Sequence, residues 1–264
     1  MMNKMYVLDH GYVELLRVDG DDEFLAQTAR TSTQSTGDPQ KDARLVTRLV
    51  RDRHTSPIEF GGVVLELKMP IFVARQWMRH RTGAFNEFSM RYTEAPKEYY
   101  LPELERCQAQ STFNKQGSAE SLDHDLAYSM IDTIRDNSEE AHARYEALIE
   151  KGLTRELARS VLPVNFYTKV RWKIDLHNLM HFIKLREDPH AQYEIRVYAE
   201  IIHKMLNVLF PAAMKAYEDF IENKIEVSPE LAAALAVALS RMADSDEDIV
   251  LSSEEQEFIK RNHG

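Results

Sequence analysis

Polar and apolar residues alternate along four stretches of the chain, which is the pattern of β-strands with two unlike faces. The stretches cover residues 12–18, 63–69, 85–92 and 164–174. Pro70 ends the second stretch, because proline cannot take part in a central strand. We therefore expect four strands, of which the last is the longest.

Apolar residues recur at helical spacing between these strands, and polar residues stand where helices would begin. Helix caps are expected at Asp21 or Asp22, Asp38, Thr154, Asp175 and Ser228. The predicted helices cover residues 22–30, 39–54, 71–78, 155–162, 176–187 and an Ala-rich stretch from 229, with a short last helix after Ser252 or Ser253. Residues 119–151 are expected to form one long helix or a broken pair, and another helix runs from about Pro189 either to Phe210 or beyond Pro211 to Asn223. Residues 94–118 contain Pro96, Pro102 and Gly117 and are expected to form a loop.

Together these elements predict an α+β fold with a mixed, largely antiparallel sheet and flanking helices. The chain has no Gly-x-Gly-x-x-Gly or P-loop motif, so we expect no Rossmann domain. With 264 residues, 44% of them hydrophobic, the chain can bury one sizeable core. We expect one main domain over residues 1–225 and an acidic, helical C-terminal extension over residues 226–264.

The formal net charge of -10 is concentrated near the end of the sequence. From Glu218 to Gly264 there are twelve acidic residues and four Lys or Arg residues, so the rest of the chain is nearly neutral. We therefore expect no broad positive surface for nucleic acid. The single cysteine cannot form an intrachain disulfide, and no apolar run reaches the ~20 residues of a membrane span. With no signal-peptide pattern in residues 1–10, a cytoplasmic protein is predicted.

A basic cluster inside this acidic chain is the first candidate site. Four arginines lie close together in sequence, namely Arg75, Arg79, Arg81 and Arg91. Alternation places Glu87, Ser89 and Arg91 on one strand face, and Gln76 lies within about one helical turn of Arg79. Arginine forks and a serine hydroxyl suit a phosphate ester. From the charge pattern alone, a surface ion-pair network is an equal alternative.

A second polar cluster contains His177 and His181, which share a helix face because they are four residues apart. Their spacing matches the zinc-protease helix, but the sequence lacks the Glu that would act as the base there. Ordinary partly buried histidines are therefore favoured over a metal site. Cys107 lies in a polar loop where nothing nearby would activate the thiol, so we expect no catalytic cysteine.

The run from Arg79 to Ser89 has the pattern Arg-His-Arg, seven residues, Ser, and this resembles the flavin-dependent thymidylate synthases. Arg75-Gln76-Trp77 before the run and Met90-Arg91-Tyr92 after it are similar to the same family. Further matching motifs are His54-Thr55-Ser56-Pro57-Ile58-Glu59-Phe60, Arg155-Glu156-Leu157-Ala158-Arg159 with Leu162-Pro163, Leu185-Arg186 and His190-Ala191-Gln192. The resemblance extends from about residue 24 to residue 200.

The resemblance implies a methyltransferase that reductively methylates dUMP to dTMP, with residues 1–225 as its catalytic domain. It implies 5,10-methylenetetrahydrofolate as carbon donor, NADPH as hydride source and FAD as the cofactor whose N5 relays the one-carbon unit. No cysteine nucleophile is required, which agrees with our interpretation of Cys107. It also implies a homotetramer whose active sites are built from more than one subunit.

By the same resemblance, the dUMP-binding residues are Gln76, Arg79, Glu87, Phe88, Ser89, Met90, Arg91, Arg159 and Arg186. The FAD-binding residues are Ser56, Arg79, His80, Arg81, Glu87, Asp175, His177 and His181. Arg186 is expected to be catalytic and to face the pyrimidine, where a fixed cation favours loss of the N3 proton. Many relatives have Asn-x-Arg where this chain has Asp175-Leu176-His177, and Asp175 is also expected to cap a helix.

Two other functions fit parts of the sequence. A metal-dependent nucleotide hydrolase would use His177, His181 and His190 with nearby carboxylates, and it would contain stoichiometric zinc or iron. A non-catalytic regulator would bind dUMP without turnover. A flavoenzyme would instead be yellow and form dTMP.

Overall fold

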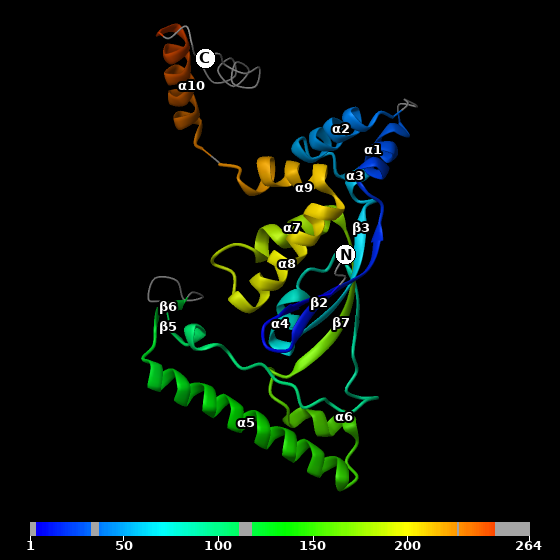
Figure 1. The fold of residues 1–264 in the computed structure, drawn as a ribbon, viewed down its shortest axis with the longest axis vertical. Coiled ribbons are helices and arrows are strands. Elements are labelled where there is room, and N and C mark those ends of the chain that lie inside the picture. The colour runs from blue at the N-terminus through cyan, green and yellow to red at the C-terminus, as the bar shows by residue number, and fades with distance from the viewer. Residues whose placement is uncertain (1–3, 33–36, 111–117, 226, 246–264) are drawn as a thin grey trace. The chain divides into compact units, whose positions relative to one another are not determined.

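We describe the protein from a computed structural model, which defines residues 4–32, 37–110, 118–225 and 227–245 (Figure 1). The chain forms two compact units, Met1–Glu222 and Asn223–Gly264. The described residues of the second unit include helix α10 (Pro229–Ser245), which begins after the expected cap Ser228. The short helix expected after Ser252 lies outside the described residues, and the domain division at residue 225 stays a prediction.

A five-stranded sheet forms the centre of the first unit, in the order β1-β2-β3-β7-β4. The strands are β1 (Lys4–Val7), β2 (Gly11–Asp19), β3 (Gly62–Pro70), β7 (Tyr167–Asp175) and β4 (Ala84–Glu87). Every pairing in this sheet is antiparallel. The longest ladder joins β3 to β7, from Gly62 opposite Asp175 to Pro70 opposite Tyr167. The expected α+β fold with a largely antiparallel sheet is confirmed.

Three parts of the strand prediction differ from the structure. The prediction lacks β1, because four residues are too few to show alternation. β4 ends at Glu87 rather than at residue 92, because the chain turns after Phe88 and Tyr92 N donates to Ser89 O (3.1 Å). The expected loop over residues 94–118 contains strand β5 (Gln108–Gln110), which pairs with β6 (Ser118–Ser121), and its residues 111–117 lie outside the described residues.

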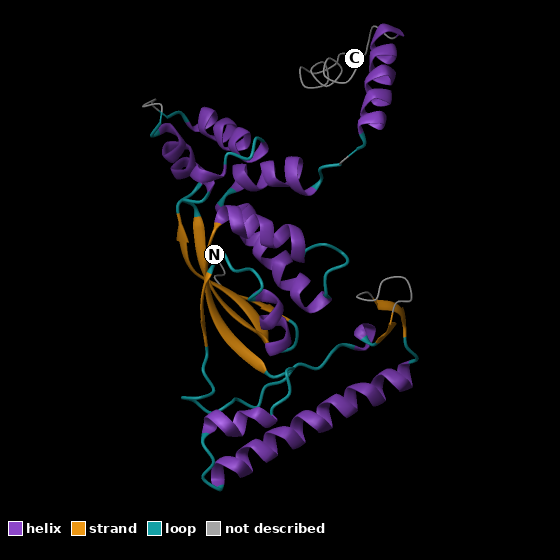
Figure 2. Cartoon of the chain, turned by 180° about the vertical axis from the view of Figure 1, so that it is seen from behind, coloured by secondary structure: helices purple, strands orange, loops and turns teal. Residues whose placement is uncertain are grey.

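Helices α4 (Ile71–Trp77), α7 (Leu176–Arg186) and α8 (Tyr193–Leu209) cover one face of the sheet (Figure 2). A second group of helices packs together. It consists of α1 (Asp22–Arg30), α2 (Pro39–Arg51), α3 (Thr55–Ile58), α9 (Pro211–Tyr217) and the π-helical turn η3 (Glu218–Glu222). Of the two ends expected for the helix from residue 189, the one at Phe210 is confirmed, because α8 ends at Leu209 with Phe210 as its C-cap. Pro211 begins α9, where its missing N–H costs no helical hydrogen bond.

The long helix α5 (His124–Glu150) packs with α6 (Arg155–Ala158) and with the 3-10 turns η1 (Leu104–Arg106) and η2 (Arg159–Val161). It begins five residues later than predicted, because Asp123 caps it by accepting from two backbone N–H groups. The helix expected over residues 155–162 becomes α6 followed by η2.

Aromatic side chains fix α4 and α7 against β7 in the core. Trp77, Trp172 and Phe182 come from these three elements and are at most 1% exposed. The ring centroid of Phe182 lies 4.5 Å from that of Trp77 and 5.0 Å from that of Trp172. Such pairs add to the stability that the burial of apolar area already provides. The elements that carry the candidate site are therefore rigidly joined.

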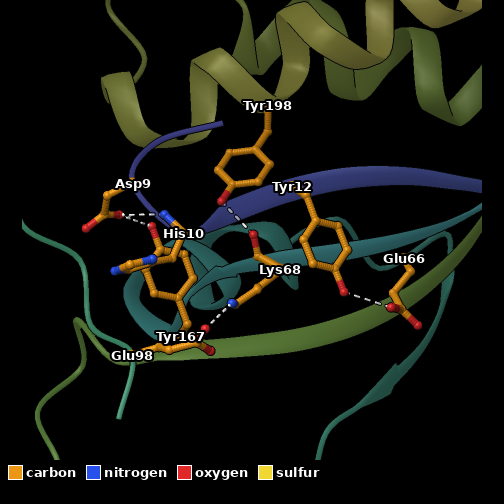
Figure 3. Close-up of polar contacts among 8 residues, drawn as sticks. All are labelled: Asp9, His10, Tyr12, Glu66, Lys68, Glu98, Tyr167 and Tyr198. Atoms are coloured by element: carbon orange, nitrogen blue, oxygen red, sulfur yellow. Dashed lines mark hydrogen bonds and ion pairs between the residues drawn. The ribbon is translucent and has the colours of Figure 1, made fainter. Parts of the chain in front are cut away.

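Two tyrosines tie the β1–β2 turn and α8 to the sheet (Figure 3). Tyr198 of α8 donates to Lys68 O (2.7 Å), and Tyr167 of β7 donates to the carboxylate of Asp9. Burial raises the pKa of both tyrosines, so they act as donors at any physiological pH. Gly11 is needed for this approach, since a Cβ there would lie 2.1 Å from the Tyr198 hydroxyl.

Candidate active site

Arg186, at the end of α7, directly contacts the Arg-His-Arg motif, which lies in the loop that follows α4. Its Nε donates to His80 Nε2 (2.9 Å), and its Nη2 lies 3.5 Å from Gln76 O. These partners are 106 and 110 residues away in sequence. Phe182, one turn before Arg186, packs edge-on against the His80 ring at 4.8 Å between centroids. The fold thus joins the expected catalytic arginine to the motif.

His80 is held in its neutral form. Burial lowers its pKa to about 4, with smaller contributions from the positive charge of Arg186 and from His181. Because Nε2 accepts the hydrogen bond from Arg186, the ring proton is assigned to Nδ1. A neutral His80 therefore holds the guanidinium without cancelling its charge.

A cavity of about 550 Å³ lies beside β4 and η2. Four of the predicted dUMP residues line it, namely Glu87, Phe88, Met90 and Arg159. Thr168 Oγ1 donates to the Glu87 carboxylate (2.8 Å) and holds it at the wall. Arg75 and Arg159 line the cavity together with the carboxylates of Glu87 and Glu156, and the two guanidiniums suit a phosphate group. Arg186 is not among the described residues that line it.

Ser89 and Arg91 do not share a strand face with Glu87, contrary to the prediction. Both lie in the turn after β4, where Arg91 N donates to Ser89 Oγ (3.3 Å). Arg91 Nη2 pairs with Glu156 (3.1 Å), and the two side chains are 48% and 55% exposed. This is the surface ion pair that the charge pattern left open, and it contributes little stability at such exposure.

A smaller cavity of about 230 Å³ contains both histidines of the second cluster, His177 and His181. Its apolar walls are formed by Leu49, Val50, Ile58, Met180 and Ile221. Arg53, Thr55 and Lys184 also line it and are not among the flavin residues predicted from the sequence. Arg53 has a φ of +58°, a left-handed conformation that is uncommon outside glycine. Arg53 falls at the end of the helix predicted over residues 39–54, whereas α2 ends at Arg51, and its left-handed backbone angle cannot be read from the sequence.

The other predicted flavin residues lie outside this cavity wall. Asp175 caps α7, and its carboxylate accepts from Asn178 N (2.9 Å) and Asn178 Nδ2 (2.7 Å). The expected helix cap is confirmed, and both carboxylate oxygens have partners. Ser56, Arg79 and Arg81 are exposed.

The histidines of the metal hypothesis do not gather in the described part of the protein. His190 is exposed, with its Nδ1 3.0 Å from Asp188 Oδ1, whereas His177 and His181 line the small cavity. Within the described residues, the group close enough to hold one ion is Glu187, His203 and Glu222. Cys107 lies beside α5 and lines neither cavity.

Residues 14–212 match the model of a family described as "Thymidylate synthase complementing protein". A flavin-dependent thymidylate synthase from Gluconobacter oxydans is 45% identical over 218 residues, which cover 81% of this chain and 72% of the relative. Another, from Ruegeria pomeroyi, is 42% identical over 254 residues, which cover 94% of this chain and 84% of the relative.

Solved structures agree with these sequence matches. The UMP/dUMP methylase PolB from Streptomyces cacaoi, bound with 5-Br dUMP, has a TM-score of 0.74 and 29% sequence identity. The match covers 82% of this chain and 98% of that chain. The same methylase bound with 5-Br UMP has a TM-score of 0.73 and 31% identity, with 81% of this chain covered and 96% of that one.

Proposed function

The chain belongs to the family of flavin-dependent thymidylate synthases, and on this premise we propose that it reductively methylates dUMP to dTMP. Methylenetetrahydrofolate is the carbon donor, NADPH the hydride source and FAD the cofactor. One observation carries the proposal for this chain. The contact between Arg186 and His80 brings the expected catalytic cation onto the signature motif from 106 residues away.

Arg186 acts on the nucleotide base in this proposal. Its guanidinium is half-buried and is held by His80 and by the backbone of Gln76. A fixed cation beside the pyrimidine stabilises the anion that forms when N3 loses its proton, and it raises the electron density at C5. Since His80 is neutral, the full charge of Arg186 is available for this.

The nucleotide phosphate binds at the larger cavity in this proposal. Arg159 in its wall supplies a bidentate donor, and Ser89 and Arg91 in the adjacent turn add a hydroxyl and a second guanidinium. Arg91 must first release Glu156, which is inexpensive because the pair is largely solvated.

The small cavity suits part of a flavin dinucleotide. Arg53 and Lys184 can bind phosphate oxygens, and the apolar wall can hold a ring. When bound, the flavin supplies the reducing equivalents and relays the one-carbon unit. A cavity of about 230 Å³ is below the roughly 300–1,000 Å³ of typical ligand pockets. We infer that neighbouring subunits of a homotetramer complete both the flavin and the nucleotide sites.

The direct test is an absorbance spectrum followed by a conversion assay. The purified protein should be yellow and should form dTMP from dUMP only when methylenetetrahydrofolate and NADPH are both present. A colourless protein that cannot take up FAD would contradict the proposal. Binding of dUMP without turnover would support the regulator, and metal-dependent nucleotide hydrolysis would support the hydrolase.

No helix in the described ranges is long and apolar enough to span a membrane. We propose a cytoplasmic location on a separate ground, which is that the substrates of the proposed reaction are soluble metabolites of that compartment. Fractionation of the producing cells, with dTMP formation measured in each fraction, tests it. Activity that sediments with the membrane fraction would contradict it.

A further inference from the structure

Gln76, a dUMP residue of the proposed function, is held by a chain of hydrogen bonds that begins in the first turn of α8. Its Nε2 donates to Gln192 Oε1, and Gln192 Nε2 donates to Glu194 Oε2 (2.8 Å). The backbone oxygen of Gln76 lies 3.5 Å from Arg186 Nη2. The side chain beside the expected catalytic cation is therefore joined, through one intermediate amide, to a carboxylate of α8.

Glu194, where this chain begins, is a buried carboxylate that is fixed in place. It is 5% exposed, and its Oε1 accepts from Tyr100 Oη (3.1 Å) and from Arg106 Nε (3.4 Å). Burial raises the pKa of Tyr100, so its hydroxyl keeps its proton and donates. The Arg106 guanidinium also lies over the Tyr193 ring, 4.6 Å from its centroid. Two side chains from a distant part of the sequence therefore anchor Glu194.

The direction of each hydrogen bond in the chain follows from this carboxylate. A carboxylate paired with an arginine can only accept, so the Gln192 amide must turn its NH2 group towards Glu194 and its oxygen towards Gln76. Gln76 must then donate to Gln192, and its own Oε1 makes no hydrogen bond within the described part of the chain. Glu194 therefore leaves Gln76 with a free acceptor oxygen.

Helix capping does not account for the side chain of Gln192. Gln192 is the N-cap of α8, yet its side chain makes no capping hydrogen bond. Glutamine is also not one of the residues that cap helices well. The contacts of its amide in the described structure are those to Gln76 and Glu194. A substitution at Gln192 thus removes the chain of hydrogen bonds and leaves those of α8 itself intact.

We propose that Glu194 and Gln192 are positioning residues, which orient the Gln76 amide so that its Oε1 accepts a hydrogen bond from dUMP. This inference rests on the proposed function, which makes Gln76 a dUMP residue. The donors that dUMP offers are N3–H of the base and the 3′-hydroxyl of the sugar. An acceptor that is already fixed binds such a donor without losing rotamer freedom. The chain of hydrogen bonds therefore acts on nucleotide affinity rather than on the chemical step.

The experiment is a dUMP titration of the full-length protein with its flavin, with steady-state dTMP formation measured on the same samples. Gln192→Met removes both hydrogen bonds at an exposed position and should keep the melting temperature and flavin content of the parent. We expect its Kd and KM for dUMP to rise about threefold to tenfold, the usual effect of one lost hydrogen bond, with kcat within about twofold of the parent. Gln27→Met is the matched control, because Gln27 is exposed and donates to Glu23 one turn away in α1.

A double-mutant cycle shows whether Gln192 acts through Gln76. In a Gln76→Ala protein, Gln192→Met should cost no further dUMP affinity, because the amide that it orients is already gone. Equal losses of affinity in the two backgrounds would overturn the proposal. So would parental dUMP affinity in Gln192→Met itself.

Gln192→Lys tests the direction of the hydrogen bonds. The lysine can still pair with Glu194, but it offers Gln76 a donor, so the Gln76 amide must turn over and present its NH2 group to the nucleotide. The added positive charge alone would favour an anionic nucleotide, so weaker dUMP binding reports the reversed amide. Affinity equal to or above that of the parent would overturn the proposal.

The titrations do not depend on turnover, so they separate this proposal from the proposed reaction. A parent protein that binds dUMP but forms no dTMP would contradict the reaction, and the dUMP affinities of the variants would still decide the role of Gln192. A parent protein that does not bind dUMP would overturn both.

Discussion

Arg186 is the residue on which the proposed chemistry depends most. Arg186→Ala removes the fixed charge but leaves His177, Arg53 and Lys184 in the small cavity. We expect FAD to stay bound while turnover falls by about 10²–10³, the usual loss when one preorganised electrostatic group is removed. Steady-state dTMP formation and the flavin absorbance of the same sample measure both quantities.

The matched control is Arg135→Ala, which removes an exposed arginine on α5 that pairs only one turn away, with Asp132. Its turnover should equal that of the parent. Near-normal turnover in Arg186→Ala itself would show that the role given to this residue is wrong.

His80 provides a test by pH. Its folded-state pKa of about 4 lies below the unfolded value of about 6.5, so the unfolded chain takes up a proton that the folded one refuses. His80 therefore lowers the free energy of unfolding as the pH falls from about 6.5 towards 4, and it has no such effect above pH 6.5. Arg186→Ala should raise the pKa of His80, because it removes a neighbouring positive charge. NMR of labelled histidine measures the pKa of His80 in the parent and in Arg186→Ala. A pKa near 6.5 in the parent would contradict the neutral, buried state given to His80.

Residue identities in the signature motif could be found from the sequence, but their contacts could not. The sequence alternation predicted that Ser89 and Glu87 share a strand face, but the strand ends at Glu87. The Ser89 hydroxyl accepts a hydrogen bond from the backbone N–H of Arg91, and such a local contact favours a turn over a continued strand. The left-handed backbone of Arg53 leaves no sequence signal when the residue is not glycine.

At the scale of elements, Gly83 sets the approach of the motif loop to the sheet. A Cβ at Gly83 would lie 2.4 Å from Trp172 Nε1 and 2.9 Å from Lys173 O, both in β7. Gly83→Ala must therefore push the start of β4 away from β7, beside the residues of the Arg-His-Arg motif. We expect a stability loss of about 1–3 kcal/mol, as for other overpacked sites, together with weaker flavin binding.

Denaturant unfolding and flavin titration measure the two effects of Gly83→Ala. Gly152→Ala is the control, since Gly152 has a φ of +88° but nothing within 4 Å of its would-be Cβ. It should cost about 1–2 kcal/mol through backbone strain alone and leave flavin affinity unchanged. Equal flavin affinities in all three proteins would contradict the role given to Gly83.

Long elements were predictable because their periodicity is strong. β3 and β7 bury one face over nine residues each, and their alternation is visible in the sequence. Short or interrupted elements were not. β1 is too short to show a period. The sequence also left open whether the helix from residue 189 ends at Phe210 or continues past Pro211, because a proline can either kink a helix or begin a new one.

At the scale of the whole molecule, the acidic extension should be dispensable for binding. Removing residues 229–264 deletes α10, which belongs to the second compact unit, and leaves every residue of the candidate site. We expect unchanged FAD and dUMP binding, with any effect confined to solubility or assembly. Binding titrations on the truncated chain check this, and loss of nucleotide binding would overturn it.

Assembly gives a sharper prediction. If Arg186 and Arg159 act in one site but come from different subunits, then Arg186→Ala and Arg159→Ala chains are each inactive alone. Unfolded together and refolded at equal ratio, they should recover about a quarter of parental activity, because a random mixture gives that share of sites with both arginines intact. No recovery in mixed oligomers would place both arginines in the same chain.

The two cavities and the contacts between subunits could not be predicted from the sequence. The small cavity and the cavity beside β4 are each visible only when distant segments are folded together, and Arg186 lines neither of them within the described residues. The sequence shows that arginines cluster near the signature motif. It does not show which walls of a binding site one chain supplies and which a neighbouring subunit must supply.

The aromatic cluster beneath His80 has an optical consequence. The chain contains two tryptophans, Trp77 and Trp172, and both are buried in this cluster. Phe182 contacts both of them and the His80 ring. Intrinsic tryptophan emission therefore comes only from this cluster, and we expect a flavin bound in the small cavity to lower that emission by energy transfer. The protein carries its own fluorescent reporter for cofactor loading, with no label required.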